Sequence, residues 1–119
     1  MKRVVFAAVA IAILAIAAVL PLAAAAQTWN NATIVDKSCS SKFKTDTAAD
    51  AHTVSCAVAC ASSGYGILTS DGTFLAFDKD GSQKALDALK ASTKKDHIRA
   101  TVTGEMDGKT IKVESISLD

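Results

Sequence analysis

The sequence predicts a mainly β domain with two helices, preceded by an apolar leader. Two observations carry this prediction. Short runs of alternating or β-branched residues flank Asp-Gly turns at residues 71–72 and 107–108, as in antiparallel hairpins. Two further segments, residues 48–61 and 82–91, have the composition or the apolar spacing of helices.

The leader, residues 1–26, has the layout of a secretory signal peptide. Lys2 and Arg3 form a charged n-region, the next 17 residues are uncharged, and the Ala tract ending at Ala26 fits an Ala-x-Ala cleavage site. An uncleaved anchor is the alternative, because 17 residues approach the ~20 that span a bilayer. We expect cleavage after Ala26, export to the periplasm or the medium, and a mature domain of residues 27–119 that is not attached to the membrane.

The charge balance argues against a nucleic-acid-binding surface. The 119 residues include 13 Lys and Arg and 12 Asp and Glu, for a net charge of +1. Cleavage removes two cations, which leaves 11 basic and 12 acidic residues and a net charge of −1. The remaining 93 residues suffice for one domain with a modest core. We expect a monomer whose partner is a small ligand or a protein, and no contact with nucleic acid.

The first half of the mature chain predicts a strand followed by a helix. Residues 29–36 end in the apolar pair Ile-Val and form the strand. Thr47 and Asp50 resemble a capping box that begins an Ala-rich helix over residues 48–61. Gly64 suits the left-handed conformation of a helix C-cap, so the helix should end just before it.

The next segment predicts a hairpin and a short helix. Residues 65–70 and 73–78 are β-rich and should pair antiparallel across the first Asp-Gly turn. Residues 79–81, Lys-Asp-Gly, form a second turn, and Ser82 caps a helix that ends near Ala91.

Two strands complete the domain. Residues 98–106 alternate between apolar and polar side chains, and residues 111–118 do so after the second Asp-Gly turn. The apolar phase of the last strand slips by one residue, which predicts a bulge near Glu114 and Ser115. The predicted order is β-α-β-β-α-β-β. Without the first helix, this is the connectivity of a five-stranded oligonucleotide/oligosaccharide-binding (OB) barrel, so the segment 45–62 becomes a helical insertion between strands one and two.

Three motifs carry a family resemblance: an early Asp-x-x-Cys, a His followed by two cysteines, and a Ser-Gly-Tyr-Gly turn. In this chain they are Asp36-Lys37-Ser38-Cys39, His52 with Cys56 and Cys60, and Ser63-Gly64-Tyr65-Gly66. Together with the Asp-Gly hairpin turns, they resemble a family of small, exported, uncharacterised bacterial OB-like proteins. The resemblance extends over nearly all of the mature chain. It implies an OB-like fold and export, and it implies no enzymatic activity.

Three cysteines are an odd number for an exported chain, in which thiols normally oxidise in pairs. On the predicted insertion helix, His52, Cys56 and Cys60 are spaced by four residues and share one face. Cys39 lies in the preceding loop and could fold onto that face. These four side chains would suit Zn²⁺ or, with fewer ligands, Cu(I).

A disulfide is the alternative use of the cysteines. Within a regular helix the Cβ atoms of Cys56 and Cys60 would lie about 6 Å apart, beyond the ~3.5–4.5 Å that a disulfide needs. The remaining pairs are Cys39–Cys56 and Cys39–Cys60. Either would close a loop of 17 or 21 residues and stabilise the fold by about 3 kcal/mol.

The leading hypothesis is a non-enzymatic, exported binding module for an unidentified ligand, stapled by one disulfide and needing no cofactor. The second is a periplasmic protein that binds Zn²⁺ or Cu(I) through Cys39, His52, Cys56 and Cys60. The third is a thiol redox protein that uses the unpaired cysteine. No catalytic residue is assigned, because the chain has no nucleophile elbow and no phosphate-binding glycine loop.

Overall fold

The computed structural model describes residues 25–119, so the predicted signal peptide lies almost wholly outside the described residues. The strands are β1 Gln27–Asp36, β2 Tyr65–Leu68, β3 Phe74–Phe77, β4 Arg99–Asp107 and β5 Thr110–Leu118. The α-helices are α1 Lys37–Ser40, α2 Val54–Ala59 and α3 Lys79–Ala91, and two 3₁₀ helices are η1 Ala48–Ala51 and η2 Ala61–Ser63. No helix within this part of the chain is long and apolar enough to cross a membrane.

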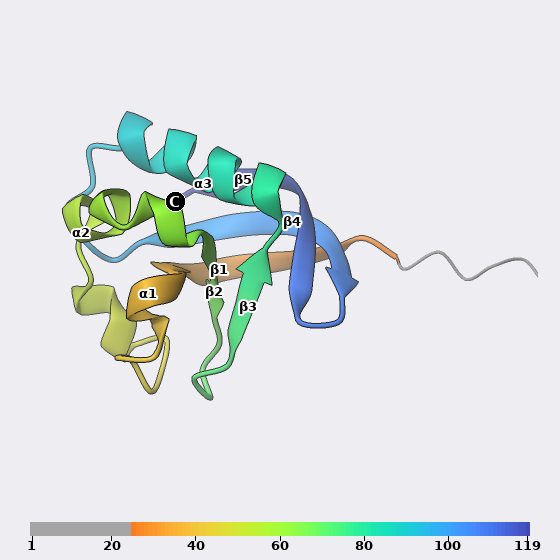
Figure 1. The fold of residues 1–119 in the computed structure, drawn as a ribbon, viewed down its shortest axis with the longest axis horizontal. Helices are drawn as coiled ribbons and strands as arrows, with labels where there is room; N and C mark the ends of the chain where they lie inside the picture. Colours follow the sequence, from red (N-terminus) through yellow and green to blue (C-terminus); the bar gives the residue numbers. More distant parts are fainter. Residues whose placement is uncertain (1–24) are drawn as a thin grey trace, which may run out of the picture.

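The five strands close into a barrel in the order β1-β2-β3-β5-β4 (Figure 1). Strand β1 pairs antiparallel with both β2 and β4, and the barrel closes where β3 runs parallel to β5. The helix α3 connects β3 to β4, while α1 and α2 lie between β1 and β2 in the chain. The predicted mainly β fold and OB-like barrel are confirmed.

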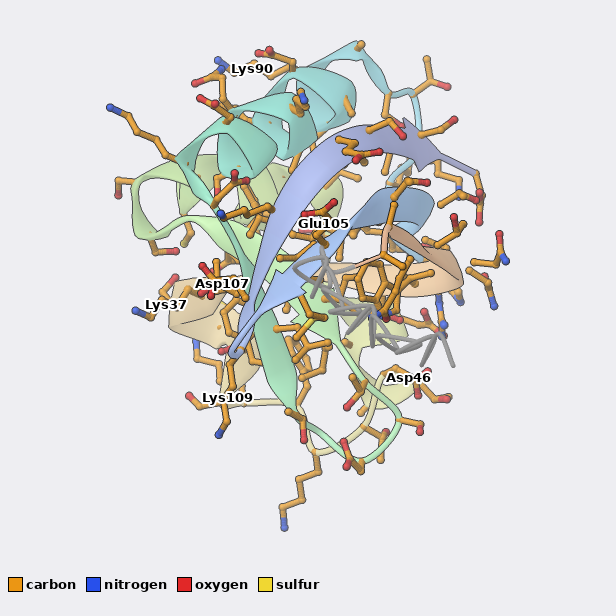
Figure 2. The ribbon with its side chains drawn as sticks, turned by 90° about the vertical axis from the view of Figure 1, so that its right-hand side faces the viewer. Lys37, Asp46, Lys90, Glu105, Asp107 and Lys109 are labelled. Carbon is orange, nitrogen blue, oxygen red and sulfur yellow. The ribbon has the colours of Figure 1, made fainter. Side chains whose placement is uncertain are left out.

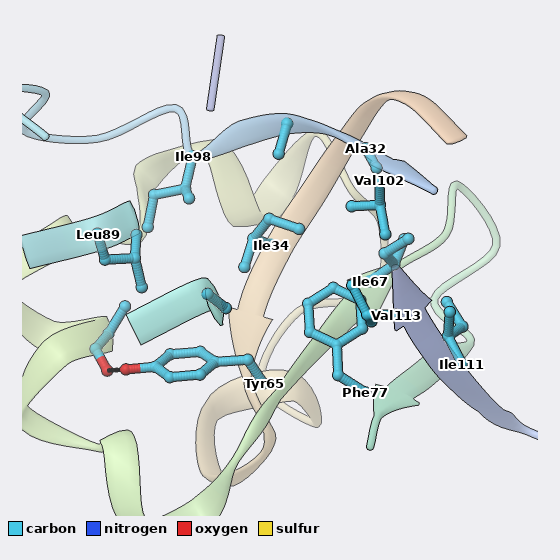
Figure 3. Close-up of a cluster of buried hydrophobic side chains, with 13 residues drawn as sticks. Ala32, Ile34, Tyr65, Ile67, Phe77, Leu89, Ile98, Val102, Ile111 and Val113 are labelled. Carbon is cyan, nitrogen blue, oxygen red and sulfur yellow. Dashed lines mark hydrogen bonds between the residues drawn. The ribbon is translucent and has the colours of Figure 1, made fainter. Parts of the chain in front are cut away.

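The larger of two clusters of apolar side chains fills the barrel beneath α2 and α3 (Figure 3). Ile34 from β1, Val102 from β4 and Ile111 from β5 meet inside it, and Leu89 of α3 covers one end. Tyr65 is buried at the start of β2, and its hydroxyl donates a hydrogen bond to the backbone oxygen of Ala57, 2.7 Å away. The core therefore holds both helices onto the barrel.

The predicted bulge in the last strand is confirmed. Thr103 pairs with Ser115 and Gly104 pairs with Val113, so Glu114 has no partner on β4. The extra residue restores the inward direction of the apolar side chains that follow it. This explains the one-residue slip in the apolar pattern.

The prediction that Ser82 caps the second helix was wrong. Asp78 is the N-cap of α3, and its Oδ1 accepts hydrogen bonds from the backbone N–H of Gly81 at 2.9 Å and of Val113 at 3.3 Å. Gly81, which the sequence predicts to lie in a turn, is buried in the first turn of the helix. A Cβ at this position would lie 2.5 Å from Val113 Cγ2, so glycine allows α3 to pack tightly against β5.

The prediction of one continuous helix over residues 48–61 was also wrong. The segment forms η1, an extended step at His52 with ψ 128°, and then α2. Thr53 explains the break, because its side-chain oxygen accepts a hydrogen bond from the backbone N–H of Cys56 at 3.1 Å and starts a new helix. The insertion is therefore a series of short helical turns.

An ion pair anchors η1 to the start of β4. Asp50 accepts two hydrogen bonds from Arg99, from Nε at 2.9 Å and from Nη2 at 3.0 Å. The backbone oxygen of Asp50 also accepts a hydrogen bond from the N–H of His97 at 3.0 Å. Asp46 lies 3.5 Å from the same guanidinium, so Arg99 draws two acidic residues of the insertion onto the barrel.

Replacing Asp50 by Ala should lower the free energy of unfolding by about 1–3 kcal/mol, since it removes a two-bond contact with a charged group. The hydrogen bonds from Arg99 hold the pKa of Asp50 below its ordinary value, although burial opposes them. The carboxylate therefore stabilises the fold above its unfolded-state pKa, and this contribution is lost as the pH falls through the lower folded-state pKa. Urea denaturation of wild type and variant should show the full difference near about pH 6 and a smaller one near about pH 3. A difference that does not change with pH would contradict the assignment.

Candidate functional site

The site is built on Asp36, the last residue of β1. Its backbone is extended, and its carboxylate turns back to cap α1: Oδ2 accepts hydrogen bonds from the N–H of Cys39 at 3.0 Å and from Ser38 Oγ at 2.6 Å. The side chain is fully buried, at 0 % exposure. An acidic residue at a helix N-cap is favoured locally, and here the same residue lies where the insertion leaves the barrel.

His52 supplies the second part of the site. Because the backbone is extended at this residue, the imidazole reaches back over the barrel, and its Nε2 lies 2.7 Å from Asp36 Oδ1. The side chain is 7 % exposed. The ring of Phe43 packs edge-on against it, with 5.5 Å between the ring centroids. The pair thus joins residues that are 16 positions apart in the chain.

Cys39 completes a group of three side chains that could ligate a metal ion. One carboxylate oxygen of Asp36, the Cys39 sulfur and one His52 ring nitrogen all lie within 4.8 Å of one another. Asp36 and His52 are buried, and Cys39 is half-buried. The structure therefore contains an Asp-Cys-His group with three different metal-binding atoms.

The hydrogen bonds determine which groups of the site carry charge. Burial alone would raise the pKa of Asp36, but the hydrogen bonds from Ser38, His52 and Cys39 outweigh it and lower that pKa. Burial raises the pKa of the Cys39 thiol, and the hydrogen bond to the Asp36 carboxylate raises it further. The site thus combines a stable carboxylate with a protonated thiol.

Tyr65 borders the site without joining it. Burial raises the pKa of its hydroxyl to about 12, and the negative charge of Asp36 adds to the shift. The phenol therefore stays neutral, as its hydrogen bond to the backbone of α2 requires.

The structure brings together only part of the predicted four-residue metal set. Cys39 and His52 meet as predicted, but Cys56 is exposed on α2 and lies outside the group. Cys60 is half-buried, and it is not one of the three grouped ligands. The prediction that His52, Cys56 and Cys60 share one helix face was wrong, because the chain does not continue as one helix from His52 to Cys60.

Sequence reasoning missed Asp36 as a member of the site. The available signal was the Asp-x-x-Cys motif, which places a carboxylate three residues before a cysteine at a helix start. An Asp in this position is a favoured N-cap, which turns its carboxylate towards the backbone N–H of the cysteine.

The three cysteines are free, and no disulfide joins them in residues 25–119. The helix α1 packs against the end of the insertion, where the N–H of Ser38 donates to Ser63 Oγ at 3.2 Å and Ser63 Oγ donates to the backbone oxygen of Cys60 at 2.9 Å. This brings the segments that carry Cys39 and Cys60 together. The predicted pairings of Cys39 with Cys56 or Cys60 stay predictions.

No family model matches the chain, and no curated protein or solved structure matches it significantly. The resemblance to small exported OB-like proteins therefore stays a prediction.

Replacing His52 by Ala should lower the free energy of unfolding by about 1–3 kcal/mol, because the buried Asp36 carboxylate loses one of its donors. His97 offers a matched control, since its side chain is 67 % exposed and pairs only with the neighbouring Asp96. His97→Ala should change the stability by less than about 0.5 kcal/mol. Chemical denaturation of both variants in a chelating buffer tests the expectation. Equal effects of the two substitutions would contradict it.

Proposed function

We propose that this chain is an exported, non-enzymatic module that binds Zn²⁺ through Asp36, Cys39 and His52. The observation that carries the proposal is the convergence of three metal-binding atoms within 4.8 Å at the point where the insertion leaves the barrel. Two of the three residues, Cys39 and His52, are among the four for which the sequence suggested metal binding.

The chemistry of the three donors favours Zn²⁺ over Cu(I). Zinc accepts carboxylate oxygen, thiolate sulfur and imidazole nitrogen in one tetrahedral site. Cu(I) prefers soft sulfur ligands, and this group contains a single cysteine together with a carboxylate. Three protein ligands would leave one position of a tetrahedral ion for a further ligand.

The surroundings of the ligands also suit a metal. Ser38 Oγ and the backbone N–H of Cys39 both donate to Asp36 Oδ2, so they orient the carboxylate while Oδ1 faces His52. Hydrogen bonds of this kind fix the direction of a metal ligand. Binding would replace the hydrogen bond between Asp36 and His52 and would release the thiol proton of Cys39.

The same groups support a binding role over thiol catalysis. A nucleophilic or redox-active cysteine needs a lowered pKa, whereas burial and the neighbouring carboxylate raise the pKa of Cys39. Asp36 contacts both the thiol and the imidazole, so its charge stabilises the protonated thiol.

The proposal can be tested with protein purified after expression of the full chain and stripped with a chelator. Zinc at about 100 times its dissociation constant should raise the free energy of unfolding by about 2.7 kcal/mol. Co²⁺ should produce a thiolate-to-metal absorption band. Cys39→Ser keeps a hydroxyl that can bond to Asp36, and it should abolish both the band and the stabilisation.

Cys56→Ser is the matched control, because Cys56 is exposed and lies outside the group. This variant should bind Co²⁺ and Zn²⁺ like the wild type. Stabilisation that is unaffected by Cys39→Ser, or that disappears in Cys56→Ser, would overturn the proposed ligand set. Thiol counting on the same samples identifies any fraction in which Cys39 has formed a disulfide and cannot bind the metal.

A further inference from the structure

A groove lies between α2 and the end of α3, separate from the three grouped ligands. Its volume is about 540 Å³. The residues that line it are Thr53, Val54, Ser55, Val58, Leu89, Lys90, Ser92, Lys94 and Lys95. This volume is within the ~300–1,000 Å³ range of sites that hold small organic ligands.

The floor of the groove is apolar. Val54 and Val58 lie one turn apart on α2 and are only partly buried, although both pack against the core. Leu89 of α3 also lines the groove and is buried. The groove therefore presents a strip of apolar side chains from both helices, and the two valines of this strip remain partly exposed.

The rim of the groove is cationic. Lys90 lies in the last turn of α3, and Lys94 and Lys95 follow in the next loop, so three lysines line the groove together with its apolar residues. Within residues 25–119, none of the three forms an ion pair with a carboxylate. The neighbouring Asp96 is paired with His97 at 2.7 Å.

Hydrogen bonds join the loop after α3 to α2 and order the loop itself. The N–H of Val54 donates to the backbone oxygen of Lys95 at 2.9 Å, and the N–H of Lys94 donates to Ser92 Oγ at 3.1 Å. The Lys94 ammonium donates to the backbone oxygen of His97 at 3.4 Å. The groove is thus formed in the folded chain before any ligand is bound.

We propose that this groove binds a small anionic amphiphile, a carboxylate with a short alkyl chain, with the chain along Val54 and Val58 and the head group among the three lysines. Charge complementarity identifies the occupant, because an apolar floor bordered by three cations without acidic partners matches a hydrocarbon with one negative end. The site needs no metal and goes beyond the zinc proposal. It also lies away from the hairpin between β4 and β5, as the positions of Lys90 and Lys109 show in Figure 2.

The test uses decanoate, below its micelle concentration, added to the isotopically labelled protein in a chelating buffer. Amide chemical shifts should change at α2 and at residues 89–95, with a single dissociation constant. Lys94→Gln with Lys95→Gln should weaken binding about tenfold, equivalent to about 1.4 kcal/mol. The same double change at Lys109 and Lys112, which are exposed on and beside the β4–β5 turn, removes equal charge and should leave the affinity unchanged.

Decyltrimethylammonium provides the opposite charge on the same chain length. It should bind at least about tenfold more weakly than decanoate if the lysines recognise the head group. Equal binding of the two amphiphiles, shifts that map to the barrel strands, or an equal loss in the Lys109 and Lys112 variant would overturn the proposal. Because no metal is present, failure here leaves the zinc experiment unaffected.

Discussion

The buried carboxylate of Asp36 is the group on which the arrangement of the insertion depends. An unpaired charge at this depth would be very costly, and the chain avoids that cost by surrounding the carboxylate with donors from Ser38, Cys39 and His52. Each donor belongs to the connection between β1 and β2, while Asp36 is the last residue of β1. The hydrogen bonds of Asp36 therefore fix both the start of α1 and the position of His52 against the end of β1.

The connection between β1 and β2 could not hold its shape by helix formation alone. Its helical pieces are four, four, six and three residues long, and helices shorter than about 12 residues are marginal in water. Three tertiary contacts compensate: the Asp36–His52 pair, the double hydrogen bond between Asp50 and Arg99, and the bond from Tyr65 to the backbone of α2. The proposed zinc ligands and the proposed amphiphile groove thus share one scaffold, since His52 lies just before α2 and Val54 and Val58 of α2 line the groove.

The barrel could be predicted from sequence because its signals are local. Alternation in the last two strands, the two Asp-Gly turns and the phase slip at Glu114 each reflect a residue and its near neighbours. The site could be predicted only in part. Cys39 and His52 are residue types that commonly bind metals, whereas the role of Asp36 depends on its contact with His52, 16 positions away in the chain. The prediction of one helix in the insertion was wrong because Thr53 begins a new helix. Its side-chain oxygen accepts the hydrogen bond of a backbone N–H, and this outweighs the helix propensity of the Ala-rich residues on either side.

Hydrogen exchange of the variant Asp36→Asn tests the central role of this carboxylate most directly. Asparagine keeps the size of the side chain and can still cap α1, but it removes the charge that His52 and Ser38 stabilise. Amides in residues 48–63 should lose protection by about tenfold or more, while amides of β4 and β5 keep theirs. Unchanged protection in the insertion, or an equal loss throughout the barrel, would contradict the claim that Asp36 organises this segment.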